Sequence, residues 1–183
     1  MTTSAPHLHV RELTETDLPL LLDYWFKNDD AFLEGMGVDL AKMPTREEFS
    51  NMLQSQVQLP VEVRRSFALI WEADGQPVGH SNTNPTRFGE DAYMHLHLWK
   101  SNIRRQGLGA ELVRLSLSHY FKKLNLKTLY SEPYALNPAP HCVLEKVGFR
   151  FVKEYVTTPG FINFEQPVKR WELTRKAWSE LNA

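Results

Sequence analysis

Two histidines alternate with leucines in one short β-like segment of this 183-residue chain, at His95 and His97. Side chains two residues apart on a strand point to the same face, so the pair would share a face with Tyr93 and Trp99. Imidazole titrates near neutral pH, which suits a general base acting on an amine through water. The alternative is a pair of hydrogen-bonded structural histidines. His-x-His also occurs in zinc sites, but no further ligands converge in the sequence, so we predict no metal.

A glycine-rich turn follows the histidines and opens an apolar-periodic segment. Gly107 and Gly109 would let an anionic ligand approach the backbone amides at a helix start, where unpaired N–H groups and the helix dipole favour negative charge. The turn has neither the G-x-x-x-x-G-K-[ST] string of a P-loop nor the third glycine of the dinucleotide fingerprint, because Leu112 stands there. The pattern therefore predicts a phosphate or pyrophosphate site of another kind.

The string Arg104-x-x-Gly107-x-Gly109 resembles the acyl-CoA pyrophosphate loop of the GNAT superfamily of N-acyltransferases, [QR]-x-x-G-x-[GA]. A second segment, NPAPHCVLEKVGF, is similar to the later superfamily pattern N-x-x-[AS]-x-x-x-[YL]-E-K-x-G-F. Its matching residues are Asn137, Leu144, Glu145, Lys146, Gly148 and Phe149. The order of elements from Leu8 to Leu173 agrees as well, so the resemblance covers nearly the whole chain.

The resemblance implies a bent mixed sheet, flanked by helices and splayed between its fourth strand (93–99) and its fifth (127–134), with acyl-CoA in the gap. It implies direct attack of an amine on the thioester of acetyl-CoA, with a backbone amide around Trp99 polarising the thioester carbonyl. The residues so assigned to acetyl-CoA are Leu98, Trp99, Lys100, Arg104, Arg105, Gln106, Gly107, Leu108, Gly109, Ala110 and Asn137.

The chain departs from the superfamily pattern at the position of the usual general acid. Many relatives carry a tyrosine where Leu144 stands, and relatives similar to the ribosomal-protein alanine acetyltransferases carry a serine where Pro140 stands. Neither acid transfers to this chain. The catalytic candidates are therefore His97 and His95 as base and Tyr134, just past the fifth strand, as donor of a proton to the thiolate.

Acidic residues gather in the irregular stretch between the two N-terminal helices, which in this fold borders the acceptor cleft. We predict that an acidic set binds the cationic amine, the alternative being a solvated acidic surface. Its members are Asp29, Glu34 and Asp39, joined by Glu90 before the fourth strand.

The elements that must position these residues follow from local signals. Thr45 and Glu48 form a capping box, Thr16 is a plausible cap of the preceding helix, and Asp74-Gly75 marks a hairpin. The resulting order, β-α-α-β-β-β-α-β-α-β-β, is that of a mixed α/β fold. We expect a single domain over 8–173 and a C-terminal helical tail over 174–183.

The composition of the chain limits the classes of partner that we expect. A net charge of -1 argues against nucleic acid or an anionic membrane, and no segment is apolar enough to span a bilayer. The lone Cys142 forms no internal disulfide and suits a reducing cytoplasm, as does the absence of a signal peptide. The leading prediction is an N-acetyltransferase that transfers an acetyl group from acetyl-CoA to a primary amine of a small molecule or amino acid, in a protein compatible with a homodimer. The alternatives are a protein N-terminal or lysine acetyltransferase and a non-catalytic acyl-CoA sensor.

Overall fold

A computed structural model describes residues 5–99 and 107–181. Its strands are β1 (Leu8–Glu12), β2 (Phe67–Ala73), β3 (Gln76–Arg87), β4 (Asp91–Leu98), β5 (Thr128–Ser131), β6 (Arg150–Thr157) and β7 (Gln166–Thr174). Its α-helices are α1 (Leu18–Lys27), α2 (Asp30–Gly35), α3 (Arg46–Gln58), α4 (Leu108–Lys123), α5 (Pro138–Lys146) and α6 (Arg175–Leu181). Short 3-10 helices are η1 (Glu15–Asp17), η2 (Leu40–Lys42) and η3 (Val61–Val63). None of the helices described is long and apolar enough to cross a membrane.

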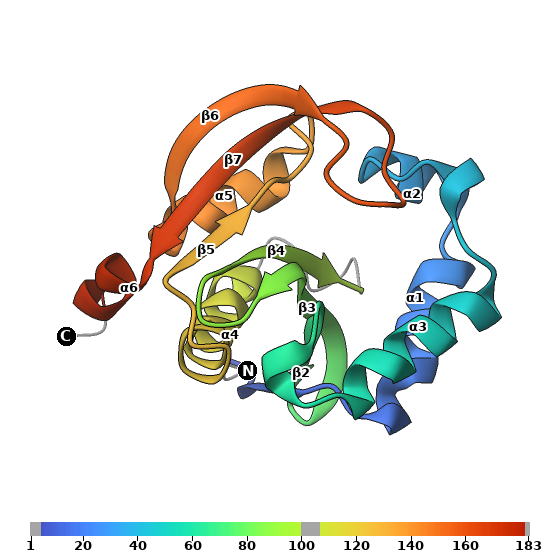
Figure 1. Ribbon diagram of the computed structural model, residues 1–183, viewed down its shortest axis with the longest axis horizontal. Coiled ribbons are helices and arrows are strands. Elements are labelled where there is room, and N and C mark those ends of the chain that lie inside the picture. Colours follow the sequence, from blue (N-terminus) through green and yellow to red (C-terminus); the bar gives the residue numbers. More distant parts are fainter. Residues whose placement is uncertain (1–4, 100–106, 182–183) are drawn as a thin grey trace.

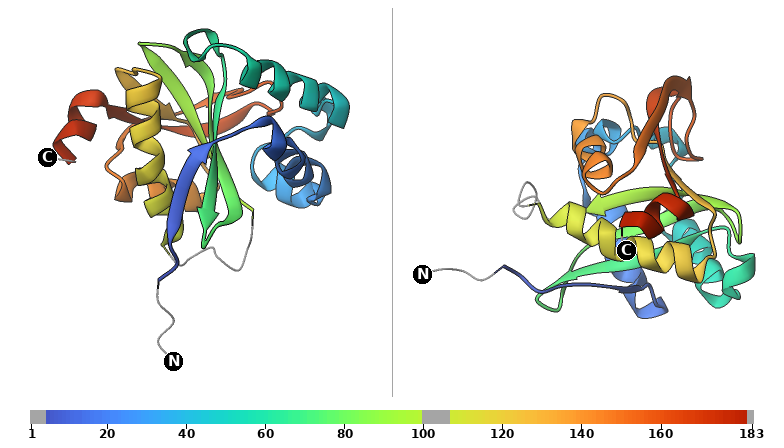
Figure 2. Two further views of the ribbon diagram at one scale, coloured as in Figure 1. Left: turned by 90° about the horizontal axis from the view of Figure 1, so that it is seen from below. Right: turned by 90° about the vertical axis from the view of Figure 1, so that its left-hand side faces the viewer.

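The seven strands form one sheet in the order β1-β2-β3-β4-β5-β7-β6. The β4–β5 pair is parallel and the other pairs are antiparallel. The N-terminal helices α1 and α3 lie on the opposite side of the sheet from α4 (Figures 1 and 2). This is the mixed, helix-flanked sheet that the sequence predicts.

Strand β2 is buried on both faces, which anchors the two helix layers to one sheet. Leu69 and Trp71 pack in the core on the α4 side, whereas Ile70 packs with Leu21 of α1. The buried indole N–H of Trp71 donates to Ser116 Oγ at 2.8 Å, so the core polar group is satisfied. Packing on both faces of β2 therefore holds the helices in place on the two sides of the sheet.

The sheet opens between β4 and β5, as the resemblance implies. The two strands pair only over Asp91–Tyr93 and Thr128–Tyr130. Beyond them the Ser131 hydroxyl donates to Met94 O at 2.9 Å, and the described part of β4 then continues without β5. The described end of β4 therefore does not pair with β5, and we call this region the gap.

Local signals locate most elements but not all of them. The Asp74-Gly75 hairpin is confirmed, with both residues at positive φ, and so is the Thr45–Glu48 capping box of α3. The first helical segment starts at Thr14 rather than at the expected Thr16, because Asp17 completes a capping box with Thr14. The fifth strand is shorter than the predicted 127–134 range.

Candidate active site

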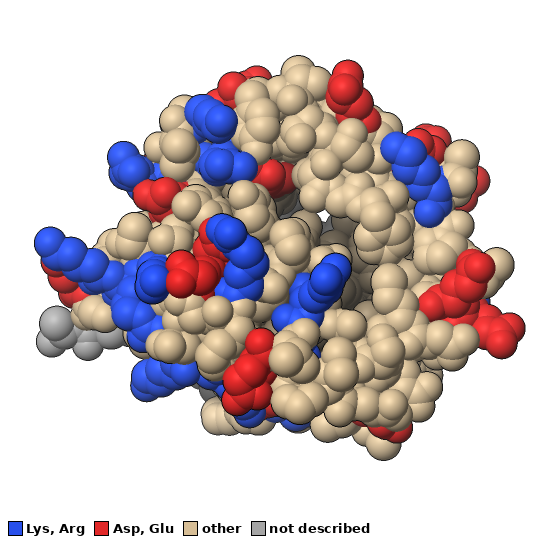
Figure 3. Space-filling view, in the orientation of Figure 1, with Lys and Arg blue, Asp and Glu red and all other residues tan. Residues whose placement is uncertain are grey.

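A cavity of about 430 Å³ lies against the histidine-bearing strands. Its polar sheet residues come from β3 and β4, whereas the helices α1 and α3 contribute mainly apolar side chains. The sheet residues are His80, Asn82, Asn84, His95 and His97, and the helix residues are Leu21, Trp25, Phe49, Met52, Leu53 and Gln56. Figure 3 shows the molecule hollowed near the centre of this face, with walls that carry few charged side chains.

The connection between β6 and β7 closes the far side of the cavity through residues 160–163. It reaches back to the segment after α2 (Figure 1) through a β-bridge between Val38 and Asn163. The Asn163 and Gln166 side-chain amides also donate to Gly37 O, at 2.8 and 2.9 Å. Segments about 120 residues apart therefore complete one enclosure.

Three histidines, rather than the two that the sequence singles out, face this cavity. His80 on β3 pairs in register with His97 on β4, and their rings stack with centroids 4.4 Å apart. Asn82 pairs with His95 in the same way. The period-two pattern of His80, Asn82 and Asn84 was the signal for this wall, since alternate residues of a strand share a face.

His80 is fixed as a neutral ring. It is 2% exposed, and its Nδ1 accepts the indole N–H of Trp99 at 2.7 Å, so the proton of a neutral ring resides on Nε2. Burial, with a smaller contribution from His95, lowers its pKa to about 3. His80 therefore does not titrate near neutral pH.

His97 lies in an aromatic cluster. Its Nδ1 shares a hydrogen bond of 3.1 Å with the Tyr24 hydroxyl, and the Trp25 ring packs edge-on against it at 5.1 Å. Burial and then the neighbouring His80 and His95 hold the pKa of His97 well below its usual value. Protonation of His97 is consequently costly.

His95 has one ring nitrogen engaged and one open. Because a carbonyl oxygen can only accept, His95 Nε2 carries the proton and donates it to Asn84 O at 3.0 Å. The other nitrogen, Nδ1, has no hydrogen-bond partner among the described residues. Burial lowers the pKa of His95, but the Asn84 carbonyl and the negative charge of Glu132 oppose that shift. A neutral His95 thus presents a free lone pair.

The described part of the glycine turn has the geometry expected at a helix start. Gly107 is the N-cap of α4 and has a φ of +78°, in the left-handed region that favours glycine. A Cβ built on Gly109 would lie 3.4 Å from Leu98 Cδ1 and 3.7 Å from Val143 Cγ2. The start of α4 is therefore close to the end of β4 and to α5. The predicted contacts at Lys100, Arg104, Arg105 and Gln106 lie outside the described residues.

The backbone around Trp99 refines the expected oxyanion contact. The Trp99 N–H donates to Val78 O at 2.9 Å, so it points toward β3 and is already engaged. Because backbone groups alternate along a strand, the N–H of Leu98 points to the other side, toward the gap. The Trp99 N–H is thus already engaged, and a backbone amide around Trp99 for the thioester carbonyl stays a prediction.

Two other predicted residues lie near the gap but outside the cavity wall. Tyr134 forms an isolated β-bridge with Val168, and its ring packs edge-on against Phe164 at 5.9 Å. Asn137 caps α5 as expected, although its side chain makes no capping hydrogen bond. The structure does not bring Tyr134 onto the same wall as the histidines.

The predicted acidic set does not line the cavity, and most of its members have structural partners. The Asp29 and Asp39 carboxylates accept backbone N–H groups at the starts of α2 and η2. Glu90 pairs with Lys127 at 2.8 Å, and Glu34 belongs to α2 without reaching the cavity wall. The short helix α2 explains the discrepancy, because the stretch expected to be irregular uses its acids as caps.

No group of three or more His, Cys, Asp or Glu side chains in the described ranges could hold a metal ion. The expectation of no metal therefore stays a prediction about the whole chain. Cys142 is exposed on α5.

A family model described as "Acetyltransferase (GNAT) domain" matches residues 7–150. The chain belongs to the GNAT family of acetyltransferases. It is thus an acetyltransferase, and acetyl-CoA is the acyl donor that the family uses. A search of curated proteins finds no match.

Solved GNAT structures share the fold at low sequence identity. The ribosomal L7/L12 α-N-protein acetyltransferase RimL, in complex with coenzyme A, is 17% identical with a TM-score of 0.75, covering 97% of this chain and 98% of that one. The aminoglycoside acetyltransferase AAC(6')-Ib, with coenzyme A and kanamycin, is 19% identical with a TM-score of 0.74, covering 97% and 100%. The spermidine N-acetyltransferase of Vibrio cholerae, with CoA and spermine, is 18% identical with a TM-score of 0.75, covering 94% and 98%.

Proposed function

We propose that this GNAT protein transfers the acetyl group of acetyl-CoA to a primary amine of a small molecule or amino acid, by direct attack through a tetrahedral intermediate. The observation that carries the proposal is the double role of β4. Its His95 and His97 side chains face a cavity of small-molecule size, while alternate backbone groups of the same strand face the gap beside β5. Amine and thioester would meet across this one strand.

The gap and the start of α4 suit acetyl-CoA. The pantetheine arm would lie along the β4 backbone near residues 98–100, with its pyrophosphate on residues 104–110 and Asn137 beside the arm. The positive φ of Gly107 and the first-turn amides of α4 support an anion there, since the helix dipole adds to the unpaired N–H groups.

His95 is the base we propose within the histidine pair. Its Nδ1 would accept a proton from the attacking amine, directly or through one water, while Nε2 continues to donate to Asn84 O. The imidazolium so formed keeps that carbonyl and the charge of Glu132 in its favour. His97 has neither the carbonyl contact nor the influence of Glu132, and aromatic rings surround it. We therefore propose that His97 forms part of the acceptor wall and is not the base.

The leaving thiolate needs less assistance. A thiol pKa near ~8.5 makes CoA a fair leaving group before it is protonated. Tyr134 stays the predicted proton donor. For that role the sulfur of CoA, bound in the gap, would have to lie within hydrogen-bond distance of the Tyr134 hydroxyl.

Substitution of His95 tests the proposal. In His95→Gln we expect kcat to fall by about 10²- to 10³-fold, in the range of lost general-base catalysis, with unchanged affinity for acetyl-CoA. Thiol release across a panel of primary amines gives the rate, and calorimetry gives the affinity. His9→Gln, an exposed histidine on β1, is the matched control.

Two results would contradict this assignment in different ways. Wild-type rates in His95→Gln would remove His95 from the reaction. Tight acetyl-CoA binding by the wild type without acetylation of any amine would point to an acyl-CoA sensor.

A further inference from the structure

The charges on the cavity wall are few and of one sign. Within the described ranges, Arg65 is the only wall residue with a permanently charged side chain, and no Asp or Glu lines the cavity. The remaining wall is apolar or neutral, since the histidine pKa values are all lowered. Among the described residues, an acceptor in this cavity therefore meets no carboxylate on the wall but can meet a guanidinium.

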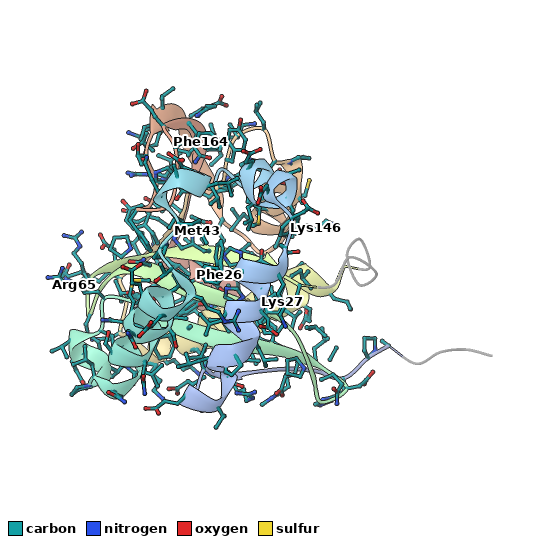
Figure 4. The ribbon with its side chains drawn as sticks, turned by 90° about the vertical axis from the view of Figure 1, so that its right-hand side faces the viewer. Phe26, Lys27, Met43, Arg65, Lys146 and Phe164 are labelled. Atoms are coloured by element: carbon teal, nitrogen blue, oxygen red, sulfur yellow. The ribbon has the colours of Figure 1, made fainter. Side chains whose placement is uncertain are left out.

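Arg65 has an anchored backbone and an uncommitted side chain. Its N–H donates to Gln56 Oε1 at 2.8 Å, and its carbonyl accepts the Thr86 N–H at 2.9 Å. The residue is exposed, and its guanidinium makes no ion pair with any described residue. Figure 4 shows Arg65 at the left-hand edge of the molecule in that view. Because the arginine is exposed and also lines the cavity, it lies at the cavity mouth.

The strand register sets the spacing between Arg65 and the proposed base. Ala68 on β2 pairs with Asn82, which pairs with His95, so these three residues form a row across the sheet. Arg65 precedes Ala68 by three residues, at a bend just before β2, and three residues of chain span at most roughly 10 Å. An arginine side chain covers part of that distance, so an acceptor can contact Arg65 while its amine faces His95.

Charge decides which amines fit. A polyamine or aminoglycoside would bring several ammonium groups against a wall without a carboxylate, and burying unpaired charge is costly. A carboxylate at the mouth would instead form a charge-assisted, bidentate pair with the guanidinium. Resting on the proposed function, we infer that the acceptor is a primary monoamine with an apolar body and a carboxylate at the end remote from the amine.

Matched probes test the inference. 4-(Aminomethyl)benzoate carries the three features, its carboxamide and benzylamine lack the carboxylate, and spermidine and kanamycin are polycations. We expect the wild type to prefer 4-(aminomethyl)benzoate over its carboxamide by roughly 10-fold or more in kcat/KM, as for a hydrogen bond to a charged group. Neither polycation should be a better substrate than the carboxamide.

Substitution of Arg65 identifies the group responsible. Arg65→Gln should raise KM for 4-(aminomethyl)benzoate by roughly 10- to 100-fold, leave kcat within about two-fold, and leave the carboxamide unaffected. Arg150→Gln, an exposed arginine on β6 that does not line the cavity, controls for loss of a positive charge. Equal effects of the two substitutions, or a preference for a polycation, would overturn the inference.

Direct binding of the same probes separates this inference from the proposed function. If no amine is acetylated but calorimetry shows Arg65-dependent binding of 4-(aminomethyl)benzoate, the ligand class stands and the catalytic proposal fails. If amines are acetylated without regard to Arg65 or to the carboxylate, the catalytic proposal stands and the ligand class is wrong.

Discussion

The two sides of β4 are built by different means. On the side proposed for acetyl-CoA, the described features are backbone ones: a strand end that does not pair with β5, a left-handed glycine and the start of α4. On the side proposed for the acceptor, the cavity wall combines residues of two helices, three strands, the segments after α2 and before β2, and the connection between β6 and β7. The backbone features of the first side arise from a short stretch of sequence. The wall of the second side forms only when segments far apart in the sequence come together in the fold.

This contrast explains why one family serves many acceptors. Solved relatives that share the fold are described with spermine or with kanamycin, and each has coenzyme A. A backbone cradle tolerates wide sequence change because every residue supplies the same N–H and C=O groups. Side chains on the opposite wall have no such constraint, and we expect the acceptor to depend on them.

Blocking the backbone side should have the largest effect. In Gly109→Trp the indole would occupy the space between the start of α4, Leu98 and Val143, where a single Cβ is already 3.4 Å from Leu98. We expect acetyl-CoA affinity to fall by more than about 100-fold, because at least two hydrogen bonds to charged phosphate would be lost at roughly 1.5–3 kcal/mol each. Calorimetric titration with acetyl-CoA measures it.

Leu115→Trp, at an exposed position of the same helix, is the control for adding an indole to α4. Thermal unfolding of both variants shows whether the fold survives. Unchanged acetyl-CoA affinity in a folded Gly109→Trp protein would remove the glycine turn from the cofactor site.

The same contrast limits what sequence alone predicts. Local rules find the hairpin at Asp74-Gly75, the capping box at Thr45 and the start of α5 at Asn137, because each depends on residues within a few positions. The glycine turn is found for the same reason. These features fix the order of elements and hence the fold.

The acceptor wall escapes such rules because its contacts are long-range. His80 becomes part of the site only through the β3–β4 register, which sets it opposite His97. The connection at 160–163 becomes a wall only through its bridge to Val38. The acids at Asp29 and Asp39 look available for an amine in sequence, yet local capping occupies them.

Acid should destabilise the protein through His80 on the cavity wall. His80 is neutral in the folded protein with a pKa of about 3, whereas an unfolded histidine titrates near ~6.5. The unfolded state therefore binds more protons between these values. The stability contributed by burying neutral His80 is fully present above about pH 6.5 and is lost as the pH falls, at a limiting slope of about 1.4 kcal/mol per pH unit.

Urea unfolding at several pH values between 5 and 8 measures this dependence. His80→Gln keeps an acceptor for the Trp99 indole but removes the titrating ring, so its stability should vary less steeply below pH 6.5 than that of the wild type. Parallel curves for the two proteins would mean that His80 is not the group that takes up the proton.

The smallest effect on amine binding is expected from the acidic residues that the sequence analysis assigned to the acceptor. In a variant carrying Asp29→Asn, Glu34→Gln and Asp39→Asn, the two asparagines still cap α2 and η2, since Asn and Asp are equivalent at such positions. None of the three residues lines the cavity. KM for the amine should therefore change by less than about two-fold, because none of the three carboxylates lines the cavity and salt weakens interactions between charges that are not in contact. Steady-state kinetics alongside Arg65→Gln provides the comparison. A several-fold rise in KM for a polycation, with Arg65→Gln neutral, would return the amine to the acidic stretch and assign the cavity another role.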